Sequence, residues 1–437
     1  MVRYRKQVLL FFQQNCITIT AIFMAVLLYS RLVPVANREP YLSLLSPEQV
    51  QALQCKVVSN PVKTGSGQFY RCTVKLQQVA GAVSSSGDRG EALATFQASG
   101  KVSVYIPSSI MEAHYPGKLY SAATGFSTGL IEQGAYVHLS GRTNSSQEGE
   151  PIFYATNCNV LGYPKNFWGR VQEFRGLCRL QFKRLMHGWG DAGGLLVALL
   201  CGSGEYTDSA VKDDFRSAGL AHVLALSGMH LSFFAGLASA AFQRSGRRLS
   251  TILSLLAIIL FVWFAGFTPS LLRATICSLL GMATGLFGVR APTIRILALC
   301  FFIHIAIIPT DIFQLSFQLS YLALAGILLL GPFFDPLTHS FLPAPVATSV
   351  SASVGAQIFS SPLTLFSLGT MMPGGIIASV VVSPLVSLFM TVGVVSIILS
   401  LLWAPLGESL GHLVNLLYNC TIIPVKIFAK IPALELP

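Results

Sequence analysis

Polar and ionisable side chains interrupt the apolar second half of the chain at Arg216, His222, His230, Arg273 and Gln357. A charge at the centre of a membrane-spanning helix costs about 2.5–3.5 kcal/mol on insertion scales, so such residues usually face a polar interior. Each also has a simpler explanation. The arginines can reach the membrane interface or anchor a helix end, and the histidines can hold neighbouring helices together by hydrogen bonds. The pattern therefore predicts either a polar path between helices or ordinary helix packing.

A glycine directly after Ser227 marks a place where an apolar helix can break. Gly228 lies inside the run HVLALSGMHLSFFAGL, and a broken helix exposes unpaired N–H groups at its new N-terminus. Such ends favour anions, phosphate among them. We expect Arg216, His222, Ser227 and His230 to line the mouth of a path and to hold phosphate groups weakly, because a conduit must also release what it binds.

No nucleotide-binding or metal-binding motif accompanies these residues. The sequence contains no GxxxxGK[ST] stretch, and no two of its eight histidines form HxH. Ser227 and His230 alone do not make a hydrolase, because no G-x-S-x-G stretch surrounds the serine. We therefore expect no catalytic residue, no metal and no cofactor, and translocation would need pulling by a cytosolic ATPase or by strand-binding proteins.

The elements that must position these residues are mostly membrane-spanning helices. The 437 residues are 53% hydrophobic and 11% charged, whereas a soluble protein carries roughly 25% charged residues. After residue 190 the apolar residues form blocks long enough to cross a bilayer as helices. These helices are predicted at 219–242, 249–267, 271–289, 294–309, 312–331, 346–369, 374–402 and 409–428.

The first 165 residues have a different character. Residues 1–36 place Arg3, Arg5 and Lys6 before an apolar run, which predicts a membrane anchor with a cytoplasmic N-terminus. A cleaved signal peptide is the alternative, although no A-x-A site follows the run. Residues 40–165 contain alternating apolar and polar runs separated by turn residues, which predicts an extracytoplasmic OB-type barrel. Its five strands are expected at 54–60, 69–79, 93–107, 135–143 and 151–161.

Aromatic and basic side chains share these predicted strands. OB folds bind single strands by stacking bases on aromatic rings within a positive groove, although roughly half of the aromatics would serve as barrel core. The candidates are Phe69, Tyr70, Arg71, Lys75, Lys101, Tyr105, Tyr136 and His138. Cys55, Cys72 and Cys158 lie in the same segment and permit one disulfide outside the cytoplasm, with the pair left open.

Residues 166–189 predict an amphipathic helix. Its apolar positions recur at helical spacing, and its polar surface is basic, formed by Arg170, Arg175, Arg179, Lys183 and Arg184. Such a helix lies along a membrane surface. The alternative is a basic soluble helix packed on the barrel. The formal net charge of the chain, +11, agrees either with the positive-inside rule or with a polyanionic partner.

Four segments resemble, in order, the ComEC family of DNA-internalisation proteins. The stretch DDFRSAGLAHVLALSGMH resembles the family pattern FRxxGLxHLLAxSGxH, and FTPSLLRATI contains its S-x-x-R-A segment at Ser270, Arg273 and Ala274. Phe313 to Phe317 resembles its FQLSF segment, and a closing stretch contains Gln357, Pro362 and Pro384. The resemblance covers about residues 165–400.

The resemblance implies an α-helical polytopic membrane protein with an extracytoplasmic all-β domain of OB type, divided at 1–36, 40–165, 166–189 and 190–437. It implies an inner-membrane channel for single-stranded DNA in natural transformation. The implied DNA path in the membrane comprises Arg216, His222, Ser227, Gly228, His230, Arg273, Gln314 and Gln357. The expected partners are single-stranded DNA, membrane lipid, a periplasmic DNA receptor, a cytosolic ATPase or helicase, and a separate nuclease.

The sequence departs from the family in one respect. Many members end in a metallo-β-lactamase-like domain with an HxHxDH motif, which this sequence lacks, so nuclease activity is not expected of it. Two other interpretations stay open. A small-solute permease would have a closed site at the membrane midplane, and an anchored OB-domain binding or scaffold protein would have no continuous polar path.

Overall fold

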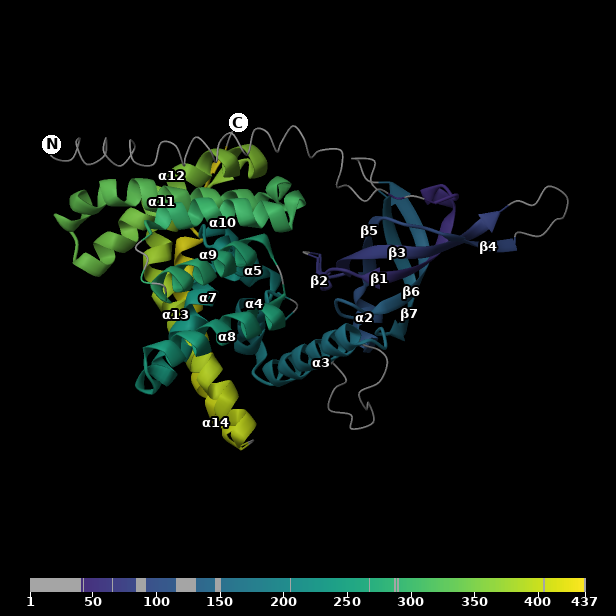
Figure 1. Cartoon of the computed structure of the whole chain (residues 1–437), viewed down its shortest axis with the longest axis horizontal. Coiled ribbons are helices and arrows are strands. Elements are labelled where there is room, and N and C mark those ends of the chain that lie inside the picture. The colour runs from purple at the N-terminus through teal and green to yellow at the C-terminus, as the bar shows by residue number, and fades with distance from the viewer. Residues whose placement is uncertain are drawn as a thin grey trace. The chain divides into compact units, whose positions relative to one another are not determined.

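The structure, a computed structural model, describes residues 41–435 except 42, 65, 84–91, 115–130, 146–150, 205, 267, 287, 289–290 and 404. The predicted anchor at 1–36 lies outside the described residues. The chain divides into two compact units, with the boundary between Thr207 and Asp208 (Figure 1). We call residues 38–207 the β unit and residues 208–437 the helical unit.

The β unit is built on a seven-stranded sheet that closes on itself. Its strands are β1 (Val50–Val57), β2 (Val62–Lys63), β3 (Phe69–Val83), β4 (Ala92–Gln97), β5 (Lys101–Pro107), β6 (Tyr136–Ser145) and β7 (Pro151–Gly162). The order β1-β6-β7-β5-β3 returns to β1 through a β1–β3 pairing. β5 and β7 run parallel, and the other pairs in this ring are antiparallel. The short helices η1 (Pro47–Gln49) and α2 (Ser108–His114) precede β1 and follow β5.

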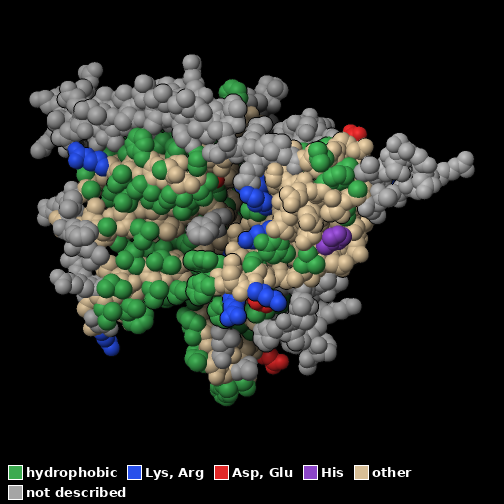
Figure 2. Space-filling model, turned by 45° about the vertical axis from the view of Figure 1, so that its right-hand side comes forward, with side chains coloured by type: hydrophobic (Ala, Val, Ile, Leu, Met, Phe, Trp, Pro, Cys, Tyr) green, Lys and Arg blue, Asp and Glu red, His purple; other side chains and the backbone are tan. Residues whose placement is uncertain are grey.

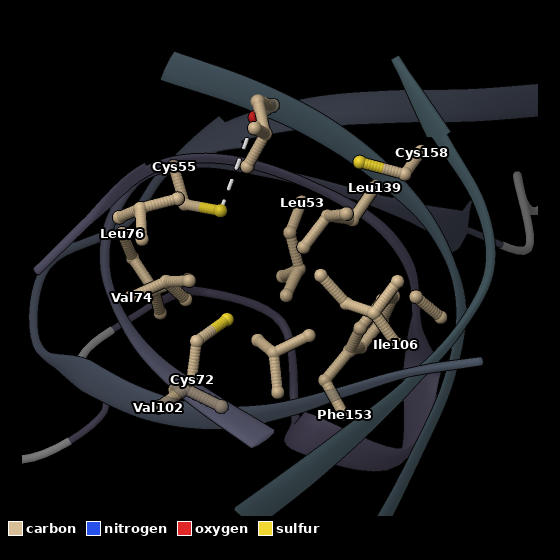
Figure 3. Close-up of a cluster of buried hydrophobic side chains, with 14 of the residues drawn as sticks. Leu53, Cys55, Cys72, Val74, Leu76, Val102, Ile106, Leu139, Phe153 and Cys158 are labelled. Carbon is tan, nitrogen blue, oxygen red and sulfur yellow. Dashed lines mark hydrogen bonds between the residues drawn. The ribbon is translucent and has the colours of Figure 1, made fainter. Parts of the chain in front are cut away.

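Alternation along the strands fills the interior of this ring. In β5 every second residue, Val102, Val104 and Ile106, is buried while its neighbours are half-buried or exposed, because successive side chains of a strand point to opposite faces. Figure 3 shows Leu53 and Phe153 extending from other strands toward the same core. The apolar positions of the sequence therefore determine which face of each strand points inward.

The five predicted strand regions are confirmed, with one change. The run predicted at 93–107 is two strands, β4 and β5, which pair with successive parts of β3. They separate at Gly100, whose φ of +118° lies in a region that glycine adopts without steric cost. A glycine inside an alternating run was the available signal for this interruption.

Two helices complete the β unit. α3 (Phe167–His187) begins at Asn166, whose side-chain oxygen accepts a 2.7 Å hydrogen bond from the Gly169 N–H, as an N-cap does. α4 (Gly190–Cys201) follows, and its residues from Ala192 to Cys201 are buried. The Thr207 hydroxyl donates to the Gly194 carbonyl across 3.1 Å. The compact unit therefore extends beyond both 165 and 189 to Thr207.

Three basic side chains of α3 do not lie on the exposed polar surface expected of them, whereas Arg170 is exposed as predicted. Arg175, Arg179 and Lys183 are buried. Glu132, 2% exposed, lies 3.0 Å from the Lys183 Nζ and 3.3 Å from the Arg179 Nε, while Arg175 donates to Gln133 across 2.7 Å. Burial alone would raise the pKa of the Glu132 carboxyl, but Lys183 and Arg179 lower it to about 2. The expectation was wrong for these three residues, because a buried carboxylate needs cationic partners.

Aromatic rings share the exposed side of α3 with Arg170 and Glu173. Phe167 is 72% exposed, Trp168 is 71% exposed and Phe174 is 61% exposed. Phe167 and Trp168 contact each other edge to face, with ring centroids 5.6 Å apart. The amphipathic pattern predicted for 166–189 is therefore present, with its charged side facing inward in the middle of the helix.

The helical unit contains a helix within each predicted spanning segment. The elements are α5 (Ser209–Ser217), α6 (Ala221–Leu224), α7 (Gly228–Phe242), η3 (Gln243–Ser245), α8 (Arg247–Ala265), α9 (Pro269–Leu286), α10 (Thr293–Ile307), η4 (Pro309–Phe313), α11 (Leu315–His339), α12 (Ala344–Leu368), β8 (Thr370–Met371), α13 (Gly375–Leu402), α14 (Leu406–Phe428) and β9 (Leu434–Glu435). Among the described residues, α11 and most of α13 are long and apolar enough to cross a membrane, and α7, α8 and α10 contain shorter apolar helices.

Large apolar side chains face outward from these helices. On α8, Ile252, Leu256, Ile259 and Leu260 are each about half exposed, and Figure 2 shows hydrophobic side chains over much of the helical surface on the face that it draws. Soluble monomers rarely expose contiguous apolar patches of more than a few hundred Å². Such a surface is typical of helices that contact lipid.

The predicted break at Ser227-Gly228 is confirmed. α6 ends at Leu224, Ser227 is extended with φ −138° and ψ 179°, and α7 begins at Gly228. The turn before α6 packs closely on the start of α13: a Cβ at Gly219 would lie 2.8 Å from the Gly375 Cα. The φ of Gly219 is +73°, so this position requires glycine for its backbone and for its space.

Candidate functional site

The first turn of α7 is tied to the extended segment before it. The Ser227 N–H donates to the His230 Nδ1 across 3.2 Å, and the Ser227 hydroxyl lies 3.3 Å from the same nitrogen. Because Nδ1 accepts, the proton of a neutral His230 ring resides on Nε2. That Nε2 is buried and has no hydrogen-bond partner among the described residues, and the whole residue is 0% exposed. A buried donor therefore remains unsatisfied beside the new helix N-terminus.

Arg273 of α9 lies at the same break. A Cβ built on Gly228 would be 3.6 Å from an Arg273 terminal nitrogen, and Ser270, one turn earlier, donates to the Leu226 carbonyl across 2.7 Å. Arg273 is 9% exposed, and its Nε has no hydrogen-bond partner in the described part of the chain. No carboxylate of that part forms an ion pair with it. Its guanidinium lies 6.0 Å from the centroid of the Tyr321 ring.

Tyr321 connects this arginine to a buried chain of polar groups that the sequence interpretation missed. The Tyr321 hydroxyl lies 3.2 Å from the His304 Nδ1 and 3.4 Å from the Cys300 Sγ. The His304 Nε2 lies 3.1 Å from an Asp311 carboxylate oxygen, and the Gln314 amide donates to the other oxygen across 2.8 Å. His304 is 0% and Asp311 is 5% exposed. His304 and Asp311 are ionisable residues within an apolar block, and this could have identified them from the sequence.

The predicted path residues therefore separate into groups. Ser227, Gly228, His230 and Arg273 meet at the start of α7, and Gln314 reaches Arg273 through the chain of contacts just described. The other three lie apart from this group. Arg216 is exposed and paired with Asp213 at 3.1 Å, His222 is exposed, and Gln357 donates to the Met372 carbonyl across 2.9 Å.

A cavity of about 360 Å³ lies elsewhere in the helical unit, between α7, α8 and α9. Its lining consists mainly of small side chains: Ala235, Gly236, Ser239, Thr251, Ser254, Met282 and Gly285. It contains no charged side chain and none of the predicted path residues. Phosphate binding at this cavity therefore has no basic group to support it.

A second candidate site lies on the outer face of the β unit. Arg71 pairs in register with Tyr105, and Tyr105 with Tyr154 across the parallel strands. The Tyr105 and Tyr154 rings stack with centroids 5.3 Å apart, and Phe69 contacts both edge to face. Lys75 and Lys101 are opposite each other further along the same two strands, and both are exposed. We call Phe69, Arg71, Lys75, Lys101, Tyr105 and Tyr154 the aromatic-basic surface.

The remaining barrel candidates lie elsewhere. Tyr70 is 4% exposed and belongs to the core, so its prediction as a surface residue was wrong: it follows Phe69 on the strand and points to the opposite face. Tyr136 and His138 are half-buried on the outer face of β6, where Lys56 lies 5.8 Å from the centre of the Tyr136 ring. The sequence prediction did not include Tyr154, although it pairs in register with Tyr105 on the neighbouring strand.

The three barrel cysteines are free thiols in the core (Figure 3). Cys55 is paired in register with Leu76, four residues from Cys72 on β3, an offset of roughly 13 Å along a strand. Cys158 is paired with Leu139, two residues from the partner of Cys55. Disulfide geometry requires Cα atoms within roughly 7 Å, so the disulfide that the sequence permitted is not formed. Burial raises the pKa of the Cys72 and Cys158 thiols to about 12.

No group of three or more His, Cys, Asp or Glu side chains that could hold a metal ion occurs among the described residues.

The helical unit, with its outward apolar surface, its broken helix and its buried arginine, defines a membrane-associated helical protein. The chain belongs to the competence protein family: the family described as Competence protein matches residues 199–437, more than half of its length. The resemblance to ComEC is thereby confirmed.

One curated relative illustrates the relationship. The chain is 27% identical over 178 residues to ComE operon protein 3 of Bacillus subtilis (strain 168), a match that covers 40% of this chain and 22% of that protein. The chain thus matches about a fifth of that relative's length. No solved structure matches the chain.

Proposed function

We propose that this protein conducts single-stranded DNA across the bacterial inner membrane during natural transformation. The observation that carries the proposal is the unpaired Arg273 beside the broken helix, in a chain of the competence protein family. A buried charge without a counter-ion is unfavourable, and a phosphodiester supplies one negative charge. Helix N-termini and nearby donors such as the His230 Nε2–H favour the same ligand.

We propose that the path is closed in the described geometry; the burial of both His230 and Arg273 supports this assignment. In the proposed open state, α7 and α9 separate at the Ser227-Gly228 break. Arg216 and His222, which are exposed and precede that break in the sequence, then receive the strand first. Contacts with single side chains keep each phosphate weakly held, which permits onward movement.

In the β unit, we propose an OB-type barrel whose aromatic-basic surface receives DNA outside the cytoplasm. Its strand order, with one parallel pair closing the ring, agrees with this fold. Stacking on aromatic rings contributes about 1–3 kcal/mol per base and tolerates any sequence. A periplasmic DNA receptor, a cytosolic ATPase or helicase and a separate nuclease are proposed to supply capture, movement and strand degradation.

The test of the membrane path is Arg273→Gln in the chromosomal gene, with fluorescent DNA followed into the cytoplasm. We expect uptake to fall at least about tenfold, the effect of losing one charged contact of about 1.4 kcal/mol. Arg273→Lys, which keeps the charge, should retain part of the uptake. The matched control is Arg295→Gln, an exposed arginine at the start of α10. Normal uptake in Arg273→Gln cells with wild-type protein levels would refute the proposal.

The test of the barrel surface is the affinity of the purified full chain for a labelled oligothymidylate. Tyr105→Ala should weaken binding roughly five- to 150-fold, the equivalent of one lost stacking contact. Tyr136→Ala, which removes an aromatic ring of β6 outside the aromatic-basic surface, should leave affinity within about twofold. Equal losses in the two variants would contradict the assignment of DNA binding to the aromatic-basic surface.

A further inference from the structure

The chain of contacts from Gln314 to Arg273 contains three groups that can exchange a proton: Asp311, His304 and Tyr321. Gln314 is exposed at the start of α11, and its amide holds one Asp311 oxygen while His304 holds the other. His304 lies in the last turn of α10, and its second ring nitrogen reaches Tyr321. Chains of Asp, Glu and His inside membrane proteins commonly mark proton relays. The contacts thus lead from the surface toward the proposed phosphate site.

The hydrogen bonds of this chain have two self-consistent directions. With neutral His304, Nε2–H donates to the Asp311 carboxylate, and Nδ1 accepts from the Tyr321 hydroxyl. When one proton is added at Nδ1, that N–H donates to the Tyr321 oxygen, and the Tyr321 O–H turns to the Cys300 sulfur 3.4 Å away. No bond between heavy atoms forms or breaks. Each geometry needs only a rotation of the Tyr321 hydroxyl hydrogen.

We propose that Asp311, His304 and Tyr321 form a one-proton site that controls the anion affinity of Arg273. The inference rests on the proposed function, because the anion in question is the DNA phosphate. Without the extra proton the Asp311–His304 pair has a net charge of −1, which offsets the positive charge of Arg273. With the proton the pair is neutral, and Arg273 attracts an anion unopposed.

Among the described residues, few other titratable or charged groups lie near His304 and Arg273. Tyr321 separates His304 from Arg273. The Cys300 thiol donates to the Arg273 carbonyl across 3.3 Å and contacts Cys277. Phe317 covers the His304 ring, with centroids 4.9 Å apart. One unit of charge on the Asp311–His304 pair, roughly 10 Å from the bound anion at an effective dielectric constant of about 20, changes the affinity for that anion on the order of tenfold. DNA should therefore bind more tightly as pH falls.

Two substitutions remove the proton site with opposite consequences. Asp311→Asn removes the negative charge, so the pair is neutral or, with His304 protonated, positive, and binding should be at least as tight as in the wild-type low-pH form at every pH. His304→Gln leaves a carboxylate at every pH, so binding should stay in the weak, high-pH form. A network that only holds α10 against α11 would not produce opposite signs, because each substitution would lower affinity or folding alike.

The experiment measures the affinity of a labelled oligothymidylate for the full chain in phosphatidylethanolamine–phosphatidylglycerol nanodiscs from pH 5.5 to 8.5. We expect the wild type to gain about tenfold in affinity toward low pH, Asp311→Asn to bind tightly throughout and His304→Gln weakly throughout. His412→Gln, at an exposed histidine of α14 outside both candidate sites, is the control and should keep the wild-type profile. Wild-type pH profiles in both Asp311→Asn and His304→Gln would overturn the proposal.

A second measurement separates failure of the proposed one-proton site from failure of the proposed function. Infrared spectra of the purified protein, recorded without DNA across the same pH range, should contain an imidazole transition that His304→Gln lacks. If this transition is present but no oligonucleotide binds at any pH, the DNA proposal fails and with it the control of Arg273. If oligonucleotide binds but the His304 transition is absent, only the proposal of a one-proton site is refuted. Variant folding is verified by thermal unfolding of each preparation.

Discussion

Replacing Glu132 by glutamine should destabilise the β unit strongly. The substitution keeps the shape of the side chain but leaves Arg179 and Lys183 buried without their carboxylate. Its magnitude follows from the pKa, about 2 in the folded protein against an ordinary 4.5. At about 1.4 kcal/mol per pKa unit, that difference is about 3 kcal/mol. Breaking a buried ion pair by removing one partner costs about 3–5 kcal/mol, which agrees.

Thermal unfolding of the full chain in detergent, followed by near-UV circular dichroism, measures this loss. For a unit of this size about 3 kcal/mol lowers the melting temperature by roughly 10 °C. Because the folded pKa is depressed, the stabilisation is complete above the ordinary value of 4.5 and is lost as pH falls toward about 2. Glu132→Gln should abolish this acid dependence. The control is Glu173→Gln on the exposed side of α3.

Two results would refute this reasoning about Glu132. A melting temperature of Glu132→Gln within about 2 °C of the wild type at pH 7 would mean that the buried cations need no carboxylate. An equal loss in Glu173→Gln would mean that α3 responds to any change of its charge.

Two further predictions concern backbone space and thiol chemistry. Gly219→Ala should lower the stability of the helical unit by about 1–3 kcal/mol in thermal unfolding, because φ is +73° and Gly375 fills the adjacent space. Gly246→Ala, with φ +93° and open space, should cost less, and an equal cost would contradict the role of the Gly375 contact. Cys72 and Cys158 should resist maleimide at pH 8, since their pKa values are about 12. Peptide mapping by mass spectrometry should find them modified only after denaturation, and rapid native labelling would refute their burial.

Periodicity predicted the elements well because it reports which face of an element avoids water. The alternation in KVSVYIP predicts the buried side of β5, and the apolar blocks after residue 190 each contain a helix. The break at Ser227-Gly228 was also predictable, because glycine weakens a helix locally. These inferences depend only on neighbouring residues.

Contacts between distant residues were not predictable in the same way. Glu132 and Lys183 are 51 positions apart, so nothing local indicated that basic residues of α3 would be buried. Tyr321 and Arg273 come from different helices, and their meeting depends on how α9, α10 and α11 pack. His304 and Asp311 are only seven positions apart, and their polarity within an apolar block was an available signal.

The inward-facing cations of α3 change how the charge of this protein should be counted. The formal charge of +11 treats all 29 lysines and arginines alike, yet Arg175, Arg179 and Lys183 are consumed inside the β unit. A phosphate can be contacted only by cations at the surface, and these three are not among them. The number of phosphate contacts is therefore smaller than the count of cations suggests, and the salt dependence of DNA binding should follow that smaller number.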